Sequence, residues 1–290
     1  MYKKLKRSIQ LCMDFFNCNK TLSQKDFRRF EGVDNSIVSL GSSLVLNDTD
    51  AYKILDLCDH LYAMGQSYAL SDLDFATKYT INEISFKNPI YCGLVGSISN
   101  HLAGTGDGND DLSSFGRWAI KTLTAHNIMI DLRNLSEKSF MSAIKESLFP
   151  VIITSAGLSG LYGKDILKPY QEKIIVDTGG LISLSITKNN LSLSDIALSI
   201  ADFLEKFGSK SLCLSLDKKK DKQIQKELEL LKIYLLSYGV SEEEIEDIFQ
   251  NNIKNFLEKH HINRFSCTQK QKSSDRCYGR SSWSKNIAGL

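Results

Sequence analysis

Short apolar runs alternate with amphipathic segments of helical spacing from about residue 36 to residue 258. Runs of strand length lie at residues 36–46, 90–95, 128–132, 150–154, 181–186 and 211–216, and helical segments lie at residues 48–64, 114–126, 136–147, 168–177, 194–207 and 224–238. Strands that alternate with helices through short loops predict an α/β fold with a parallel sheet. Because a chain of this length suits a barrel of about 250 residues, we expect a single (β/α)8 TIM-type barrel rather than a doubly wound sheet, although periodicity alone does not separate the two.

The predicted helices carry recognisable start and stop signals. Gly208 and Gly239 directly follow two of them, as is common where a helix ends in a left-handed turn. Ser241 and Glu244 have the S-x-x-E spacing of a capping box, so a last helix begins there. These regular ends indicate an intact fold.

The last part of the chain differs in composition. Residues 262–290 are rich in Ser, Lys, Arg, Gln and Asn and have little periodicity. We therefore divide the chain into a barrel at residues 1–261 and a polar, flexible tail at residues 262–290.

Charge and cysteine usage exclude several classes of protein. The net charge is +2, which calls for neither nucleic acid nor an anionic membrane. No stretch approaches the roughly 20 apolar residues of a membrane span, and the N-terminus lacks the pattern of a signal peptide. The seven cysteines are scattered and form no C-x-x-C pair, which favours reduced thiols and a cytoplasmic location.

A run of sequence matches identifies a family resemblance. Within residues 111–155, the matching positions are Phe115, Gly116, Arg117, Asp131, Leu132, Ser136, Phe140, Pro150, Val151 and Ile152. Residues 100–104 (NHLAG), 177–184 (DTGGLISL), 193–217 and 239–256 match further segments in the same order. On these residues the chain resembles the renal (membrane) dipeptidase family, peptidase family M19, over roughly residues 9–259. The resemblance implies a barrel of the metal-dependent hydrolase kind.

Catalytic members of that family share a binuclear zinc centre, which activates a bridging water and polarises the scissile carbonyl of the substrate. Its ligands include a His-x-Asp pair on the first strand and a Glu on a later strand. The resemblance places Cys12 and Asp14 at the pair, so the Asp is kept and the His is replaced. It places Gly65 at the position of the Glu.

The remaining positions of the centre are also altered. Asn134 and Ser155 stand where the family has two His ligands, and both are poor zinc ligands. Asp217 aligns with the family's catalytic Asp at the last strand, but only its position is retained, because three lysines follow it at residues 218–220. Lys164 is the nearest match to the arginine that grips the substrate carboxylate. Asn100 and His101 fall on the family's substrate-side loop.

These replacements lead to an expectation about function. We expect a catalytically inactive relative that binds a peptide or a partner protein, in a scaffold or accessory role, with no cofactor. The alternative is an active dipeptidase or hydrolase with an altered metal centre, in which Asp14 and Asp217 hold zinc. A chain without any binding role is a third reading, and a homodimer is implied by the resemblance alone.

Overall fold

The structure is a computed structural model that describes residues 13–15, 37–40, 54–56, 58–59, 67–106, 108–163, 165–186, 191–215 and 221–260. Of residues 13–15, 37–40, 67 and 221–224 it describes only the backbone. The predicted tail at residues 262–290 lies outside the described residues.

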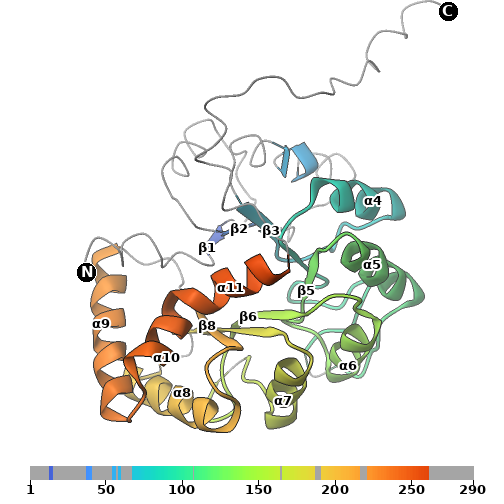
Figure 1. Ribbon diagram of the computed structural model, residues 1–290. Helices are drawn as coiled ribbons and strands as arrows, with labels where there is room; N and C mark the ends of the chain where they lie inside the picture. The colour runs from blue at the N-terminus through green and yellow to red at the C-terminus, as the bar shows by residue number, and fades with distance from the viewer. Residues whose placement is uncertain are drawn as a thin grey trace, which may run out of the picture.

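Eight parallel strands form one sheet in sequential order (Figure 1). They are β1 (Met13–Phe15), β2 (Ile37–Leu40), β3 (Ser67–Leu70), β4 (Tyr91–Gly93), β5 (Met129–Asp131), β6 (Ile152–Ala156), β7 (Leu181–Ser185) and β8 (Leu212–Ser215). Each strand pairs with the next, which confirms the predicted α/β fold with a parallel sheet. Within the described residues the series runs from β1 to β8, and no pairing of β8 with β1 closes it.

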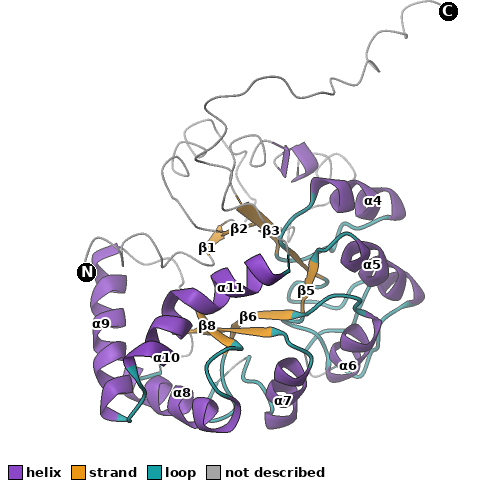
Figure 2. Ribbon diagram, viewed as in Figure 1, coloured by secondary structure: helices purple, strands orange, loops and turns teal. Residues whose placement is uncertain are grey.

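Helices follow the strands and cover the outside of the sheet (Figure 2). They are α4 (Lys78–Lys87), α5 (Ser114–Ala125), α6 (Glu137–Glu146), α7 (Pro169–Asp177), α8 (Leu193–Phe207), α9 (Asp221–Ser237), α10 (Glu242–Glu246), the π-helix η2 (Asp247–Asn251) and α11 (Asn252–Lys259). Residues 54–56 and 58–59, within the predicted helix at 48–64, are helical as well. The part of the chain that the structure describes holds no helix long and apolar enough to cross a membrane.

Serine side chains set the starts of several helices. The hydroxyls of Ser113, Ser136 and Ser192 accept the backbone N–H three residues further on, at the starts of α5, α6 and α8, as helix N-caps commonly do. Ser241 forms the predicted capping box with Glu244. The helix at Ser114 therefore begins one residue after its cap, because Ser113 and not Ser114 provides the capping hydroxyl.

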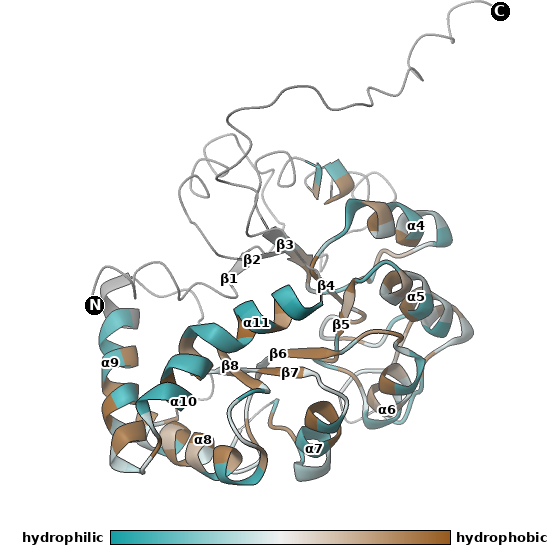
Figure 3. Cartoon of the chain, in the orientation of Figure 1, coloured by the Kyte–Doolittle hydropathy of each residue, from teal (hydrophilic) through white to brown (hydrophobic). Residues whose placement is uncertain are grey.

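Helix α11 covers one end of the sheet. Its apolar side chains Ile253, Phe256 and Leu257 pack in one cluster with residues at or near the starts of the strands: Ala69, Ile90, Tyr91, Met129, Ile152, Leu181 and Cys213. Its outer face is hydrophilic, whereas β6 and β7 beneath it are hydrophobic (Figure 3). Because α11 fills the end where the strands begin, the end where they finish is left for a site.

Sequence reasoning from periodicity missed three elements. Strands β1 and β3 are only three and four residues long, which is too short to show alternation. Helix α4 has apolar residues on more than one face, since Ile81 and Ile84 are buried while Tyr79 and Phe86 are 54% and 77% exposed. Its start is fixed by a Thr77–Thr80 capping box instead, a pattern that differs from the usual S/T-x-x-E/Q.

Candidate functional site

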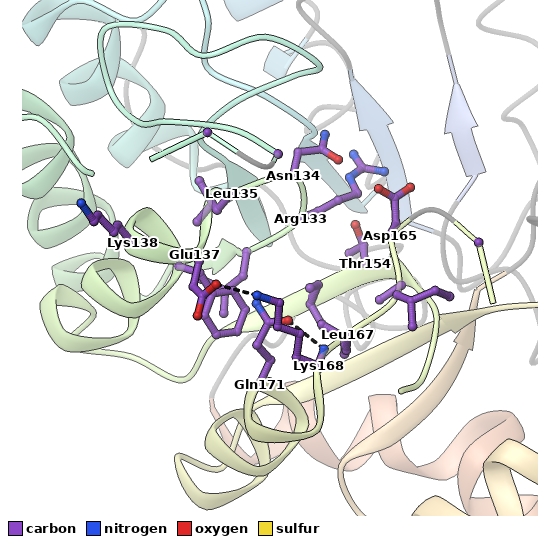
Figure 4. A pocket seen from close by; sticks show the side chains of 18 of the residues that line it. Arg133, Asn134, Leu135, Glu137, Lys138, Thr154, Asp165, Leu167, Lys168 and Gln171 are labelled. Atoms are coloured by element: carbon purple, nitrogen blue, oxygen red, sulfur yellow. Dashed lines mark hydrogen bonds and ion pairs between the residues drawn. The ribbon is translucent and has the colours of Figure 1, made fainter. Parts of the chain in front are cut away.

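A cavity of about 780 Å³ opens where β5 and β6 end (Figure 4). The segment after β5, the segment after β6, the loop near Gly106 and the first turns of α6 and α7 line it. Its charged lining residues are Arg133, Lys138, Lys168, Glu137 and Asp165. A second, apolar part of the wall comes from Leu132, Leu135, Phe140, Ile153, Ala156, Ile166 and Leu167. A wall that is both apolar and charged suits a small ligand with a polar group.

A buried carboxylate contacts two of the residues that line the cavity. Asp131 at the end of β5 is fully buried and accepts hydrogen bonds from the backbone N–H of Thr154 at 3.0 Å and from its hydroxyl at 2.5 Å. It also accepts the backbone N–H of Arg133 at 3.1 Å. Burial raises the pKa of Asp131, and the nearby guanidinium of Arg133 and the bonds from Thr154 oppose that rise, as expected for a charge removed from water but partly compensated.

Arg133 brings a positive charge to the cavity. Its Nε lies 3.9 Å from Oδ2 of Asp131, and its side chain is only 13% exposed. Figure 4 shows its guanidinium and the carboxylate of Asp165 turned toward one another, with Asn134 beside them. A guanidinium stays protonated at any physiological pH, so this charge is permanent. Sequence reasoning overlooked Arg133, although its place directly before Asn134 was the available signal.

An ion pair links the helices that flank the cavity. Nζ of Lys168 lies 2.5 Å from Oε2 of Glu137, which connects the start of α7 to the start of α6. The backbone N–H of Lys168 donates to Oε1 of Gln171 at 2.9 Å. The hydrogen bond from Lys168 holds the pKa of Glu137 below its usual value. Both ionic side chains are 56% exposed, and pairs this open to solvent add little stability.

Asn134 and Ser155 share an uncommon backbone conformation. Asn134 has φ of 64° and Ser155 has φ of 51°, both in the left-handed region that few non-glycine residues adopt. The carbonyl of Asn134 accepts the N–H of Gly106 at 3.0 Å and the hydroxyl of Thr105. Ser155 is buried, and its hydroxyl lies 3.4 Å from that of Ser215 on β8. Such conformations collect at functional sites, where the surrounding structure maintains them.

One protein family matches more than half of the chain. The model of the membrane dipeptidase family, peptidase family M19, matches residues 91–268. The chain belongs to this family. No curated protein sequence matches this chain at a significant level.

Several solved structures share the fold. A metallopeptidase from Rhodobacter sphaeroides, liganded with a phosphinate mimic of the dipeptide L-Ala-D-Ala, is 13% identical with a TM-score of 0.68, covering 87% of this chain and 99% of that one. Dipeptidase AC, a metallopeptidase of family M19, is 14% identical with a TM-score of 0.67, covering 85% and 91%. An amidohydrolase from Pseudomonas aeruginosa is 16% identical with a TM-score of 0.63, covering 89% and 98%. At these identities the likeness concerns the fold alone.

The structure describes only some of the residues that the resemblance assigns to the site. Asn134 lines the cavity, and Ser155 lies between Thr154 and Ala156, which also line it. Asp14 lies in β1 opposite Ser39 of β2, and its side chain is outside the described part. The other predicted positions, Cys12, Gly65, Lys164 and Asp217, lie outside the described residues.

Asn100 and His101, predicted on a substrate-side loop, have other contacts. The Asn100 amide donates to Oδ1 of Asp74 at 2.6 Å and to the Leu94 carbonyl at 2.9 Å. The His101 ring is stacked on Phe115, with centroids 5.5 Å apart, and its Nε2 lies 2.6 Å from the Ala76 carbonyl oxygen. Neither residue is among those that line the cavity. Asn100 therefore holds its own loop together.

The described donors do not fit the family's zinc ions. At the two positions that the resemblance aligns with zinc-binding His residues, the chain has an amide and a hydroxyl, and neither is a good zinc ligand. The hydroxyl of Ser155 faces that of Ser215. Arg133, next to Asn134, adds a permanent positive charge. Among the side chains that the structure describes, no three His, Cys, Asp or Glu residues lie together as a metal-binding group.

Proposed function

We propose that this member of the dipeptidase family does not hydrolyse peptides and instead binds a peptide or a partner protein in the cavity at the ends of β5 and β6. One observation carries the proposal: the adjacent residues Arg133 and Asn134 both line that cavity. The resemblance aligns Asn134 with a zinc-binding His of the family. A neutral amide and a permanent cation thus stand at a position that should attract a dication.

Simple electrostatics supports the loss of metal. A permanent cation beside a metal position repels a dication, and the Asp131 carboxylate 3.9 Å from Nε of Arg133 offsets part of that repulsion. The Arg133 side chain is mostly buried, so solvent screens its charge less than at an exposed site. Neutral replacements at Asn134 and Ser155 contribute no charge that would offset the repulsion.

The shape of the cavity supports a small ligand or a peptide segment. Its volume is about 780 Å³. Ligand pockets usually measure from a few hundred to about 1000 Å³, so a small molecule or a short peptide segment would fill it. The Rhodobacter sphaeroides relative holds a dipeptide mimic, which makes a peptide the first class of ligand to test. We assign no metal or other cofactor to this binding role.

We also propose that the sheet closes into a (β/α)8 barrel. The sequential parallel order of eight strands supports this closure. Adjacent strands lie about 4.8 Å apart, so strands two places apart lie about 9–10 Å apart in a flat sheet. The 3.4 Å contact between Ser155 on β6 and Ser215 on β8 therefore requires the sheet to curl inward.

Binding and hydrolysis can be followed in one sample. Proton NMR of L-Ala-D-Ala with the full chain, with and without added zinc, would report binding by saturation transfer and hydrolysis by new alanine signals. We expect binding without release of alanine in either condition. Zinc-dependent alanine release that a chelator abolishes would overturn the proposal.

A further inference from the structure

We propose that Glu172 is a positioning residue for ligand binding: its buried carboxylate on α7 holds the loop after β6 in the shape that forms one wall of the cavity. The described part of this loop comprises residues 157–163 and 165–167. Its second half lines the cavity, and Figure 4 shows Asp165 and Leu167 there. Glu172 is not among the lining residues, so it acts through the loop. The inference rests on the proposed function and names a residue that controls affinity from outside the cavity.

Glu172 occupies a position where a helix usually buries an apolar side chain. It lies three residues before Ile175, and these two are the buried residues of α7, with exposed fractions of 3% and 0%. A glutamate is rarely buried to this extent unless it is paired. Burial raises the pKa of Glu172, and the hydrogen bonds from Ser159 oppose that rise. The position therefore favours a specific polar contact over simple packing.

Both carboxylate oxygens of Glu172 contact the same residue of the loop. Oε1 accepts the backbone N–H of Ser159 at 2.6 Å, and Oε2 accepts its hydroxyl at 2.9 Å. A hydrogen bond to an ionised acceptor is stronger than one between neutral groups, and two of them fix both the place and the direction of Ser159. The nearby Leu158 and Leu161 are buried in the hydrophobic core. The first half of the loop is therefore anchored to α7 and to the core.

Backbone contacts connect this anchored half to the half that lines the cavity. The N–H of Gly157 donates to the Asp165 carbonyl, and the N–H of Leu167 donates to the Gly157 carbonyl, both at 2.9 Å. Gly157 also forms a bridge with Ile166, and a Cβ on Gly157 would lie 2.3 Å from Cδ1 of Ile166. Contacts this close transmit a displacement rather than absorb it. A shift of Ser159 therefore reaches the cavity wall.

The other contacts at this side of the cavity give the loop less support. The ion pair between Lys168 and Glu137 joins the starts of α7 and α6, but both side chains are 56% exposed, and such pairs add little stability. The tip of the loop is open to solvent, since Tyr162 is 85% exposed. The shape of the loop therefore depends on its base, where Glu172 makes its two buried hydrogen bonds.

Amide hydrogen exchange of the full chain tests the loop contact without any ligand. The amides of Gly157 and Leu167 should exchange slowly in the wild type, because both are hydrogen-bonded. Glu172→Ala should speed their exchange about ten- to a hundredfold, as the loss of hydrogen bonds to a charged group implies. The amides of β7 should keep their rates. Unchanged loop rates, or an equal rise throughout the sheet, would overturn the inference.

A conservative variant separates the contact from the fold. Glu172→Gln keeps the shape of the side chain and one acceptor oxygen, so it should fold even where Glu172→Ala does not. It should give loop exchange rates between those of the wild type and those of the alanine variant. Wild-type rates in Glu172→Gln, together with a failure of Glu172→Ala to fold, would reduce Glu172 to a packing residue and contradict the proposal.

Binding of L-Ala-D-Ala tests the consequence for the cavity. Calorimetric titration should show that Glu172→Ala weakens binding about tenfold, because a displaced wall loses contacts with the ligand. Ser159→Ala keeps the backbone bond and should weaken binding less, and adding it to Glu172→Ala should have no further effect. Asp177→Ala removes an exposed carboxylate from the same helix and should leave the affinity unchanged.

The two experiments fail in different ways. Wild-type affinity in Glu172→Ala, with a loosened loop, would overturn the positioning role. Absence of L-Ala-D-Ala binding by the wild type, or its cleavage on addition of zinc, would instead refute the proposed function. The exchange rates decide the contact between Glu172 and the loop in either case.

Discussion

Thr154 on β6 donates both its backbone N–H and its hydroxyl to the carboxylate of Asp131 on β5, at 3.0 and 2.5 Å. This double contact joins two neighbouring strands at the point where the cavity begins. It also fixes the residue that positions Arg133. The integrity of the cavity therefore depends on a buried polar pair, and such pairs are costly to break.

Replacing Thr154 with Val tests that pair. The change keeps the shape of the side chain but removes a donor from a fully buried carboxylate, so we expect the free energy of unfolding to fall by about 1–3 kcal/mol. Chemical denaturation measures the change. As a control, Thr122→Val removes a hydroxyl that bonds only within α5. That variant should cost at most about 0.5 kcal/mol, as is usual away from buried polar networks. Equal losses of unfolding free energy in the two variants would mean that the hydrogen bond to Asp131 stabilises the protein no more than a hydroxyl bond within a helix.

The raised pKa of Asp131 predicts a specific pH dependence. Its ordinary value is 3.8, and burial raises it in the folded chain, so above pH 3.8 the folded state binds more protons than the unfolded state. The contribution of Asp131 to stability is then fully present below that pH and is lost as the pH rises through the folded value. The Asp131→Asn variant has no carboxyl group to titrate at this position, so its stability should not show this loss. Unfolding curves from pH 4 to 7 should show the wild type losing stability relative to this variant, and a gain would contradict the assignment.

Gly116 in α5 tests whether an added methyl group raises or lowers the free energy of unfolding. Adding a methyl group to a helical glycine usually stabilises a protein by up to about 1 kcal/mol. Here the added Cβ would lie 2.1 Å from the carbonyl oxygen of Leu102. We therefore expect Gly116→Ala to lower the free energy of unfolding by about 1–3 kcal/mol. Ser114→Ala, at an exposed position of the same helix, should be nearly neutral, and a stabilising Gly116→Ala would show that the close approach is absent.

Ser155 provides a second test of backbone conformation. In an ordinary strand, glycine is less stable than valine by about 1 kcal/mol. Ser155 has φ of 51°. The order should therefore reverse here, because valine tolerates the left-handed region poorly and glycine adopts it freely. Thermal melts of Ser155→Gly and Ser155→Val would give the order. A more stable valine variant would mean that the strand is regular at this position.

The fold was predictable because it depends on patterns local in sequence. The helices at 114–126, 136–147 and 194–207 appear within a residue or two of their predicted bounds, since hydroxyl caps and buried apolar stripes set them. Strand β6 instead begins two residues later than predicted and continues to Ala156, past the irregularity at Ser155. That shift depends on contacts with neighbouring strands, which a single sequence does not display.

The candidate site was predictable only in part. Resemblance located Asn134 at the strand end, because the flanking residues match the family, but it gave no reason to single out Arg133. Arg133 contacts Asp131, and Asp131 is held by Thr154, which lies 23 residues further along the chain and meets it only in the folded sheet. Asn100 matched the family motif, yet its contacts show a residue that organises its own loop.

The zinc content of the full chain tests the central claim most directly. Protein purified without chelator and then soaked in zinc should contain almost none after removal of excess metal, as elemental analysis would show. Arg133→Ser should not by itself restore it, because Asn134 and Ser155 remain poor ligands. About one zinc per chain would favour an altered centre at Asp14 and Asp217, which Ala replacements would identify. About two zinc ions per chain would contradict the account.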